Sequence, residues 1–73
     1  DYNHSALDVL GRLDDKDPKV CYLKAMVLSR LGQHEEAMKY YRLCLAYDPY
    51  MRHRANLDPE MYLLVMQDVN NNQ

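Results

Sequence analysis

Hydrophobic residues recur along the chain at intervals of three and four positions, in stretches separated by short polar runs. The first stretch starts at Ser5 and has the spacing that places apolar side chains on one face of a helix. It ends in the polar run 14–17. Alternation with period two never extends beyond a few residues, so the pattern predicts an all-α fold. The apolar positions of the first stretch are Ala6, Leu7, Val9, Leu10 and Leu13.

Two longer stretches follow, and residues that favour helix ends stand at their boundaries. Asp17 precedes Pro18, the order preferred at an N-cap and the first helical position. Gly32 favours a helix stop because glycine adopts positive φ without steric cost. Glu35 and Glu36 then stand in a first turn, where carboxylates complement the helix dipole. These signals predict two antiparallel helices joined by a tight turn. Their apolar positions are Val20, Cys21, Leu23, Ala25, Met26, Val27, Leu28 and Leu31, then Ala37, Met38, Tyr40, Tyr41, Cys44, Leu45 and Tyr47.

The last part of the chain contains a connecting segment and one further helical pattern. An Asp-Pro pair at positions 48 and 49 ends the third helix, and residues 50–57 are predicted to be a connecting segment of basic character. A further Asp-Pro pair at positions 58 and 59 predicts a fourth, shorter helix over 58–69. We expect residues 70–73 to be a frayed tail. The fold predicted is therefore a set of antiparallel helical hairpins with about four helices.

Length and charge narrow the functions that such a fold can serve. The chain has 73 residues, of which 48% are hydrophobic, so it is expected to form a single domain with a thin core. Its formal net charge is −2, which disfavours binding driven by nucleic-acid phosphates. No apolar stretch is long enough to span a bilayer. Because the chain does not begin with Met, we expect it to be a piece of a longer protein.

Histidines and cysteines give little support to a metal or thiol site. The residues concerned are His4, Cys21, His34, Cys44 and His53, and they lack the close paired spacings of metal ligands. Both cysteines fall within apolar helical patterns, which predicts buried, inert thiols. Free buried thiols are compatible with a reducing compartment such as the cytoplasm, although the sequence leaves the location open. We expect no cofactor, no metal and no catalytic residue.

The central part of the chain has small and large residues at the positions of a known repeat. Ala25 and Ala37 are small where two antiparallel helices must cross closely, and Tyr41 supplies bulk beside that crossing. Together with Gly32 and Pro49, this order resembles a tetratricopeptide (TPR) repeat, a helix-turn-helix unit of about 34 residues. The other matching positions are Leu28, Leu31 and Cys44. The chain departs from the family at Cys21, where a large aromatic residue is usual, and at Lys24, where leucine is usual.

The resemblance extends before the full repeat. Residues 1–17 are similar to the second helix of a preceding repeat, with Ala6 at the small place and Leu10 at the aromatic place. The resemblance therefore implies one TPR-like domain over the whole chain. Its parts are the half-repeat 1–17, the full repeat 18–49, the linker 50–57, a C-terminal capping helix 58–69 and the tail 70–73.

The resemblance implies a non-catalytic module that binds a protein or peptide partner, with no part for nucleic acid or membrane. Family positions on the groove side of the first helix, with one loop residue, give the candidate binding residues Lys19, Tyr22, Met26, Ser29, Arg30 and Tyr50. We also expect self-association through the helix face that carries Leu7 and Leu10. The alternative is a small helix-turn-helix domain that binds nucleic acid, favoured by the Gly32 turn and by the basic residues 52–54 but opposed by the charge balance.

Overall fold

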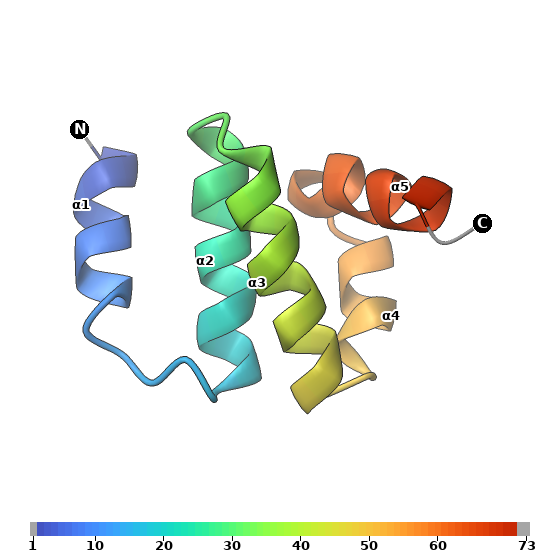
Figure 1. Ribbon diagram of the computed structural model, residues 1–73, viewed down its shortest axis with the longest axis horizontal. Coiled ribbons are helices and arrows are strands. Elements are labelled where there is room, and N and C mark those ends of the chain that lie inside the picture. The colour runs from blue at the N-terminus through green and yellow to red at the C-terminus, as the bar shows by residue number, and fades with distance from the viewer. Residues whose placement is uncertain (1, 72–73) are drawn as a thin grey trace.

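The computed structural model describes residues 2–71, and within this range every regular element is a helix, without strands. This confirms the all-α prediction and the hairpin arrangement (Figure 1). The elements in chain order are α1 (Tyr2–Leu10), α2 (Pro18–Arg30), α3 (His34–Tyr47), α4 (Met51–Asn56), the 3-10 turn η1 (Pro59–Met61) and α5 (Tyr62–Asn71).

Helices α2 and α3 form the central hairpin, and the predicted caps set its limits. The Asp17 carboxylate accepts a hydrogen bond of 2.9 Å from the Lys19 amide, at the start of α2. Gly32 has a φ of +81° after the end of α2. The next amide, that of Gln33, donates to the Leu28 carbonyl at 2.9 Å, which closes the helix end and turns the chain into α3.

Small residues lie at the contact between α2 and α3. Ala25, Ala37 and Cys44 are fully buried, so the two helix backbones can approach each other closely. Tyr41 fills the space beside them and is also buried. The predicted burial of Cys44 is confirmed, as is that of Cys21. The core is therefore centred on the hairpin, as the order of small and large residues predicts.

Helix α1 packs against α2 and ends earlier than the sequence pattern indicates. It stops at Leu10, which is buried, and Leu7 packs partly against the main core. The expectation that Leu7 and Leu10 form an uncovered face is therefore wrong, because α1 turns both residues toward the hairpin. Leu13 lies beyond the helix and is half-exposed.

Residues 51–56 form the short helix α4, within the segment 50–57 that the sequence predicts to be a linker. Met51 and Ala55 lie one helical turn apart, and both are buried against the core. The basic residues between them stay exposed. Residues 2–71 thus contain five α-helices, where the sequence predicts about four.

Helix α5 follows the turn η1 and is fixed to the hairpin through Leu64 and Asp68. The Asp58 carboxylate caps η1 at the Glu60 amide, as the Asp-Pro pair at 58 and 59 predicts. Leu64 is fully buried, and the buried Asp68 carboxylate pairs with Arg42 at 3.3 Å. The helix continues to Asn71, so the tail prediction is wrong for residues 70 and 71, while residues 72 and 73 lie outside the described range.

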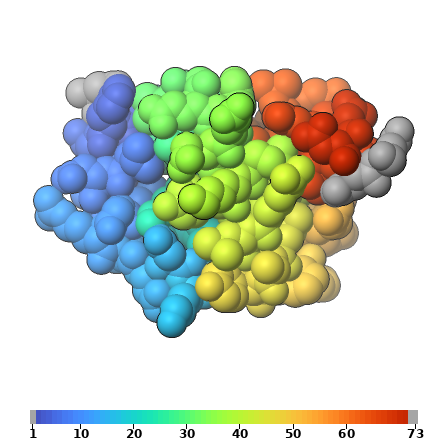
Figure 2. All heavy atoms as spheres, viewed as in Figure 1, coloured from blue at the N-terminus to red at the C-terminus, as the bar shows by residue number. Residues whose placement is uncertain are grey.

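The molecule is elongated, with principal dimensions of 34 × 23 × 19 Å. Helix α1 forms one end and α5 lies at the other, with the hairpin between them (Figures 1 and 2). Each terminal helix is covered on one side only. This arrangement determines which apolar side chains remain accessible.

Candidate partner-binding surface

One face of α2 borders three adjoining hollows. The central and largest one lies between α1 and α2 and has a volume of about 410 Å³; we call it the α1–α2 trough. It is mainly apolar, and Arg30 is the one charged residue in its lining. Its lining residues are Tyr2, Ala6, Val9, Leu10, Leu23, Met26, Val27 and Arg30.

The two smaller neighbours continue this surface in both directions along α2. The first, of about 160 Å³, shares Leu23 with the trough and reaches α4; it is lined by Lys19, Tyr22, Leu23, Met51 and Arg54. The second, of about 390 Å³, shares Arg30 with the trough and reaches α5; it is lined by Ser29, Arg30, Pro59, Glu60 and Leu63. Together they make a continuous surface along the length of α2.

The candidate residues from the sequence divide unequally over this surface. Lys19 and Arg30 are exposed, as expected, while Met26 and Ser29 are half-buried in the walls of the hollows. The expectation that Tyr22 points outward is wrong, since only 1% of its surface is accessible. Tyr50 is 77% exposed but lines none of the three hollows. Its ring instead lies 5.8 Å from that of His53 on α4.

Tyr22 is buried because the segment after the hairpin folds over it. Its hydroxyl donates a hydrogen bond of 2.7 Å to the Asp58 carboxylate, and the Arg54 guanidinium lies 5.1 Å from the centre of its ring. Burial, followed by the hydrogen bond to Asp58, raises the pKa of Tyr22 above its ordinary value. Sequence reasoning missed Arg54 and Asp58 because their proximity depends on the placement of α4.

Arg30 is also bound by a carboxylate from the same segment. Its Nε donates to Glu60 at 2.9 Å, across 30 positions of sequence. This hydrogen bond is the main cause that lowers the pKa of Glu60 and raises that of Arg30. The turn at 58–60 therefore satisfies two of the candidate residues, Tyr22 and Arg30, from within the chain.

Two other cations on this surface form no ion pair with a carboxylate of the described chain. Within residues 2–71, neither the Lys19 ammonium nor the Arg54 guanidinium takes part in an ion pair. Both line the smallest hollow, beside Leu23 and Met51. The surface along α2 thus has a mainly apolar centre, a positive end where Lys19 and Arg54 form no ion pair, and an end where Glu60 neutralises Arg30.

The hairpin that carries this surface also matches a known family. Residues 18–51 fit the family model described as tetratricopeptide repeat. Residues 18–51 are therefore a TPR repeat. The matched segment contains α2, α3 and the first residue of α4. Comparisons with curated proteins and with solved structures give no significant match. TPR repeats are typical of scaffold modules that mediate protein interactions, and residues 18–51 are one such repeat.

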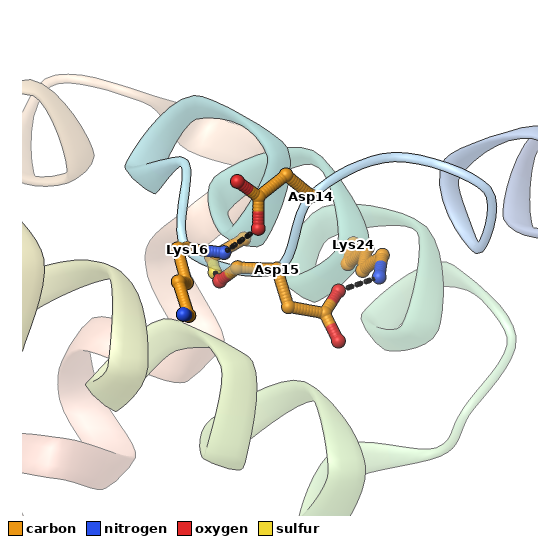
Figure 3. A network of polar contacts seen from close by, with 5 residues as sticks. Asp14, Asp15, Lys16 and Lys24 are labelled. Carbon is orange, nitrogen blue, oxygen red and sulfur yellow. Dashed lines mark hydrogen bonds and ion pairs between the residues drawn. The ribbon is translucent and has the colours of Figure 1, made fainter.

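The departure from the TPR pattern at Lys24 has a structural explanation on the opposite side of α2. Lys24 is only 4% accessible, and its ammonium forms an ion pair with Asp15 in the loop before the repeat (Figure 3). It also lies 5.2 Å from the centre of the Tyr40 ring. Cys21, the second departure, donates from Sγ to the Asp15 carbonyl at 2.9 Å. The two unusual residues of the repeat thus hold the loop that joins it to α1.

Thiol and metal chemistry find no support in the described part of the chain. Burial is the main cause that raises the pKa of Cys44 to about 11, and it also raises that of Cys21. A thiol with a raised pKa is a poor nucleophile because the thiolate is the reactive form. Residues 2–71 contain no group of three His, Cys, Asp or Glu side chains that could hold a metal ion. No helix in that range is long and apolar enough to cross a membrane.

Proposed function

We propose that this chain is a non-catalytic module that holds a segment of a partner protein along α2. The observation that supports this most directly is the continuity of the three hollows, which share Leu23 and Arg30. All candidate residues from the sequence except Tyr50 line one of these hollows. A concave, mainly apolar surface with a few polar groups at its ends is typical of sites that bind another molecule.

The distribution of charge indicates the chemistry of the segment. Apolar side chains of the partner fit the α1–α2 trough, where Leu23 and Met26 offer adaptable apolar contact. An acidic residue of the partner gains most beside Lys19 and Arg54, since these cations lack a carboxylate within the described chain. We therefore propose a partner segment with apolar residues at its centre and an acidic residue at one end.

The length of α2 sets the size of the segment. A helix of 13 residues is about 20 Å long at 1.5 Å per residue. An extended peptide covers that distance with about six residues, at roughly 3.3 Å each. Six-residue peptides are therefore the smallest probes that can reach both ends of the surface.

The test is a two-dimensional NMR titration with two peptides that share an apolar core and carry either an acidic or a basic residue at one end. We expect shifts at Lys19, Leu23 and Met26 with the acidic peptide, and weaker binding of the basic one. Lys19→Glu should weaken binding of the acidic peptide about tenfold at low salt, equivalent to about 1.4 kcal/mol.

Lys39→Glu is the matched control, because Lys39 is exposed on α3 and lines none of the three hollows. It should leave the affinity unchanged. Equal loss in both variants would point to net charge alone and count against a site at Lys19. A DNA duplex at low salt tests the helix-turn-helix alternative, which requires affinity that falls steeply as salt is added.

A further inference from the structure

The outer face of α5 carries an apolar stripe. Tyr62, Leu63, Met66 and Val69 are 61%, 61%, 42% and 44% exposed. The one charged residue of this helix is Asp68, which is buried on the opposite side. A helix that caps a repeat stack has a polar outer face. The exposed surface of α5 instead combines this apolar stripe with the polar but uncharged residues Gln67, Asn70 and Asn71. An uncharged helix with such a stripe is typical of a surface that packs against another helix.

A second apolar surface lies at the opposite end of the molecule. Tyr2, Val9 and Leu23 are exposed around the α1–α2 trough, at 75%, 57% and 45%. Figure 1 shows α1 and α5 at opposite ends, so one chain cannot cover one surface with the other. Within residues 2–71, each copy of the chain therefore has two apolar surfaces at opposite ends, with the hollow lined by Arg30 and Leu63 between them.

We propose that α5 of one copy packs into the α1–α2 trough of the next, so that copies associate head to tail. The inference rests on the function proposed above, since it names α5 of a second copy as a segment that the trough holds. A symmetric contact between two α5 helices would leave both troughs open. The head-to-tail contact buries the α5 stripe of one copy and the trough of the next at once. Further copies can therefore join the chain of contacts until the rotation between neighbours closes a ring.

Charge and length fit this pairing. Arg30 is the one charged residue in the lining of the trough, and Glu60 already pairs with it. An uncharged helix therefore meets no unpaired charge there. Helix α5 has 10 residues and α1 has 9, which gives both a length of about 14–15 Å. The last turn of α5 has no basic residue. Its carbonyl groups therefore keep a partial negative charge that suits the end of the surface near Lys19.

The test is sedimentation of the whole chain with two charge variants, one on each surface. Leu23→Asp places an acid in the trough, and Met66→Asp places one on the outer face of α5; both residues are partly exposed, so the fold should persist, as circular dichroism would verify. The average molecular mass of the wild type, measured by sedimentation, should rise with protein concentration and exceed the mass of a dimer. Each variant alone should remain monomeric.

An equal mixture of the two variants decides the geometry. Leu23→Asp keeps an intact α5 and Met66→Asp keeps an intact trough, so the mixture should form heterodimers and nothing larger. A symmetric α5 contact would instead leave Leu23→Asp dimeric on its own and give no complex between the two variants, and that result would overturn the proposal. Leu57→Asp is the control, because Leu57 is 73% exposed but lies outside both surfaces, and it should associate like the wild type.

The outcome separates this inference from the proposed function. A wild-type chain that stays monomeric at all concentrations, yet binds the acidic peptide, would overturn the head-to-tail contact and leave the peptide site standing. Conversely, Met66→Asp should lose self-association and keep its affinity for the peptide. Loss of peptide binding in Met66→Asp would show that α5 and the peptide site are not separate.

Discussion

The hydroxyl of Tyr22 links the TPR repeat to the segment that follows it. It donates to Asp58, which also caps the turn η1 through the Glu60 amide. One carboxylate thus receives a bond from the first helix of the repeat and another from the start of the C-terminal part. The position of α5 on the hairpin therefore depends in part on the Asp58 side chain.

Tyr22→Phe should lower the free energy of unfolding by about 1–2 kcal/mol, because it removes a hydrogen bond to a charged acceptor. The pKa of Tyr22 is raised in the folded state, so its contribution is complete below the ordinary tyrosine pKa of about 10 and is lost as the pH rises further. Urea unfolding at pH 8 and at pH 11 measures both effects.

The wild type should therefore lose more stability between these two pH values than Tyr22→Phe does. Tyr47→Phe is the control, since Tyr47 is 47% exposed and its hydroxyl has no recorded partner within residues 2–71. An identical pH dependence in wild type and Tyr22→Phe would contradict the role of the Tyr22 hydroxyl.

The two thiols should resist alkylation in the folded protein. Cys44 is fully buried and its pKa is raised to about 11, so at pH 8 very little of it is thiolate. Cys21 is equally buried, and its pKa is also raised. Mass spectrometry after iodoacetamide treatment should show labelling only in denaturant. Rapid labelling of either cysteine under native conditions would contradict the burial described here.

At the scale of single elements, the turn between α2 and α3 depends on Gly32. Its φ of +81° lies in the left-handed region, where a side chain costs about 1–2 kcal/mol. A Cβ at this position would have no neighbour within 4 Å, so the cost is confined to the backbone. The turn therefore requires glycine for its conformation and not for lack of space.

Gly32→Ala should accordingly destabilise the protein by about 1–2 kcal/mol in thermal or urea unfolding. Gly11→Ala is the matched control, because a Cβ there would meet only the Leu7 and Asp8 carbonyl oxygens at 3.4 Å, and its φ is not positive. It should change stability by less than about 0.5 kcal/mol. Equal effects of the two changes would count against the backbone explanation.

Local signals were sufficient to predict the hairpin but not the segment after it. Asp17 and Gly32 act on neighbouring backbone groups, so their effects can be read from the sequence. Met51 and Ala55 give α4 only two apolar positions, and the basic residues between them concealed the helical spacing. The burial of Tyr22 could not be predicted, because its partner Asp58 is 36 positions away and reaches it only after α4 has packed.

At the scale of the whole molecule, stability is concentrated in the α2–α3 hairpin. Most fully buried side chains belong to these two helices, whereas Leu10 is the one buried residue of α1. The loop between α1 and α2 is held by Asp15, through Lys24 and Cys21. Helix α1 is thus a peripheral element whose contacts depend on an already folded hairpin.

Amide hydrogen exchange should show this order directly. We expect the amides of α1 to exchange faster than those in the middle of α2 and α3, since local opening requires little loss of buried area. Asp15→Ala should speed exchange in α1 further by releasing the loop, while the middle of α3 keeps its protection. Uniform protection across the three helices would instead indicate a single cooperative unit.

The turn at 58–60 places the Glu60 carboxylate beside Arg30 at one end of the surface along α2. Glu60 is tethered to the group that it binds, so it acts as a competitor at an effective concentration in the millimolar range. An acidic residue of an incoming protein must displace Glu60 to reach Arg30, and the exchange of one carboxylate for another yields little affinity. Glu60 thereby determines the orientation of a bound partner segment. The acidic residue of that segment lies near Lys19 and away from Arg30.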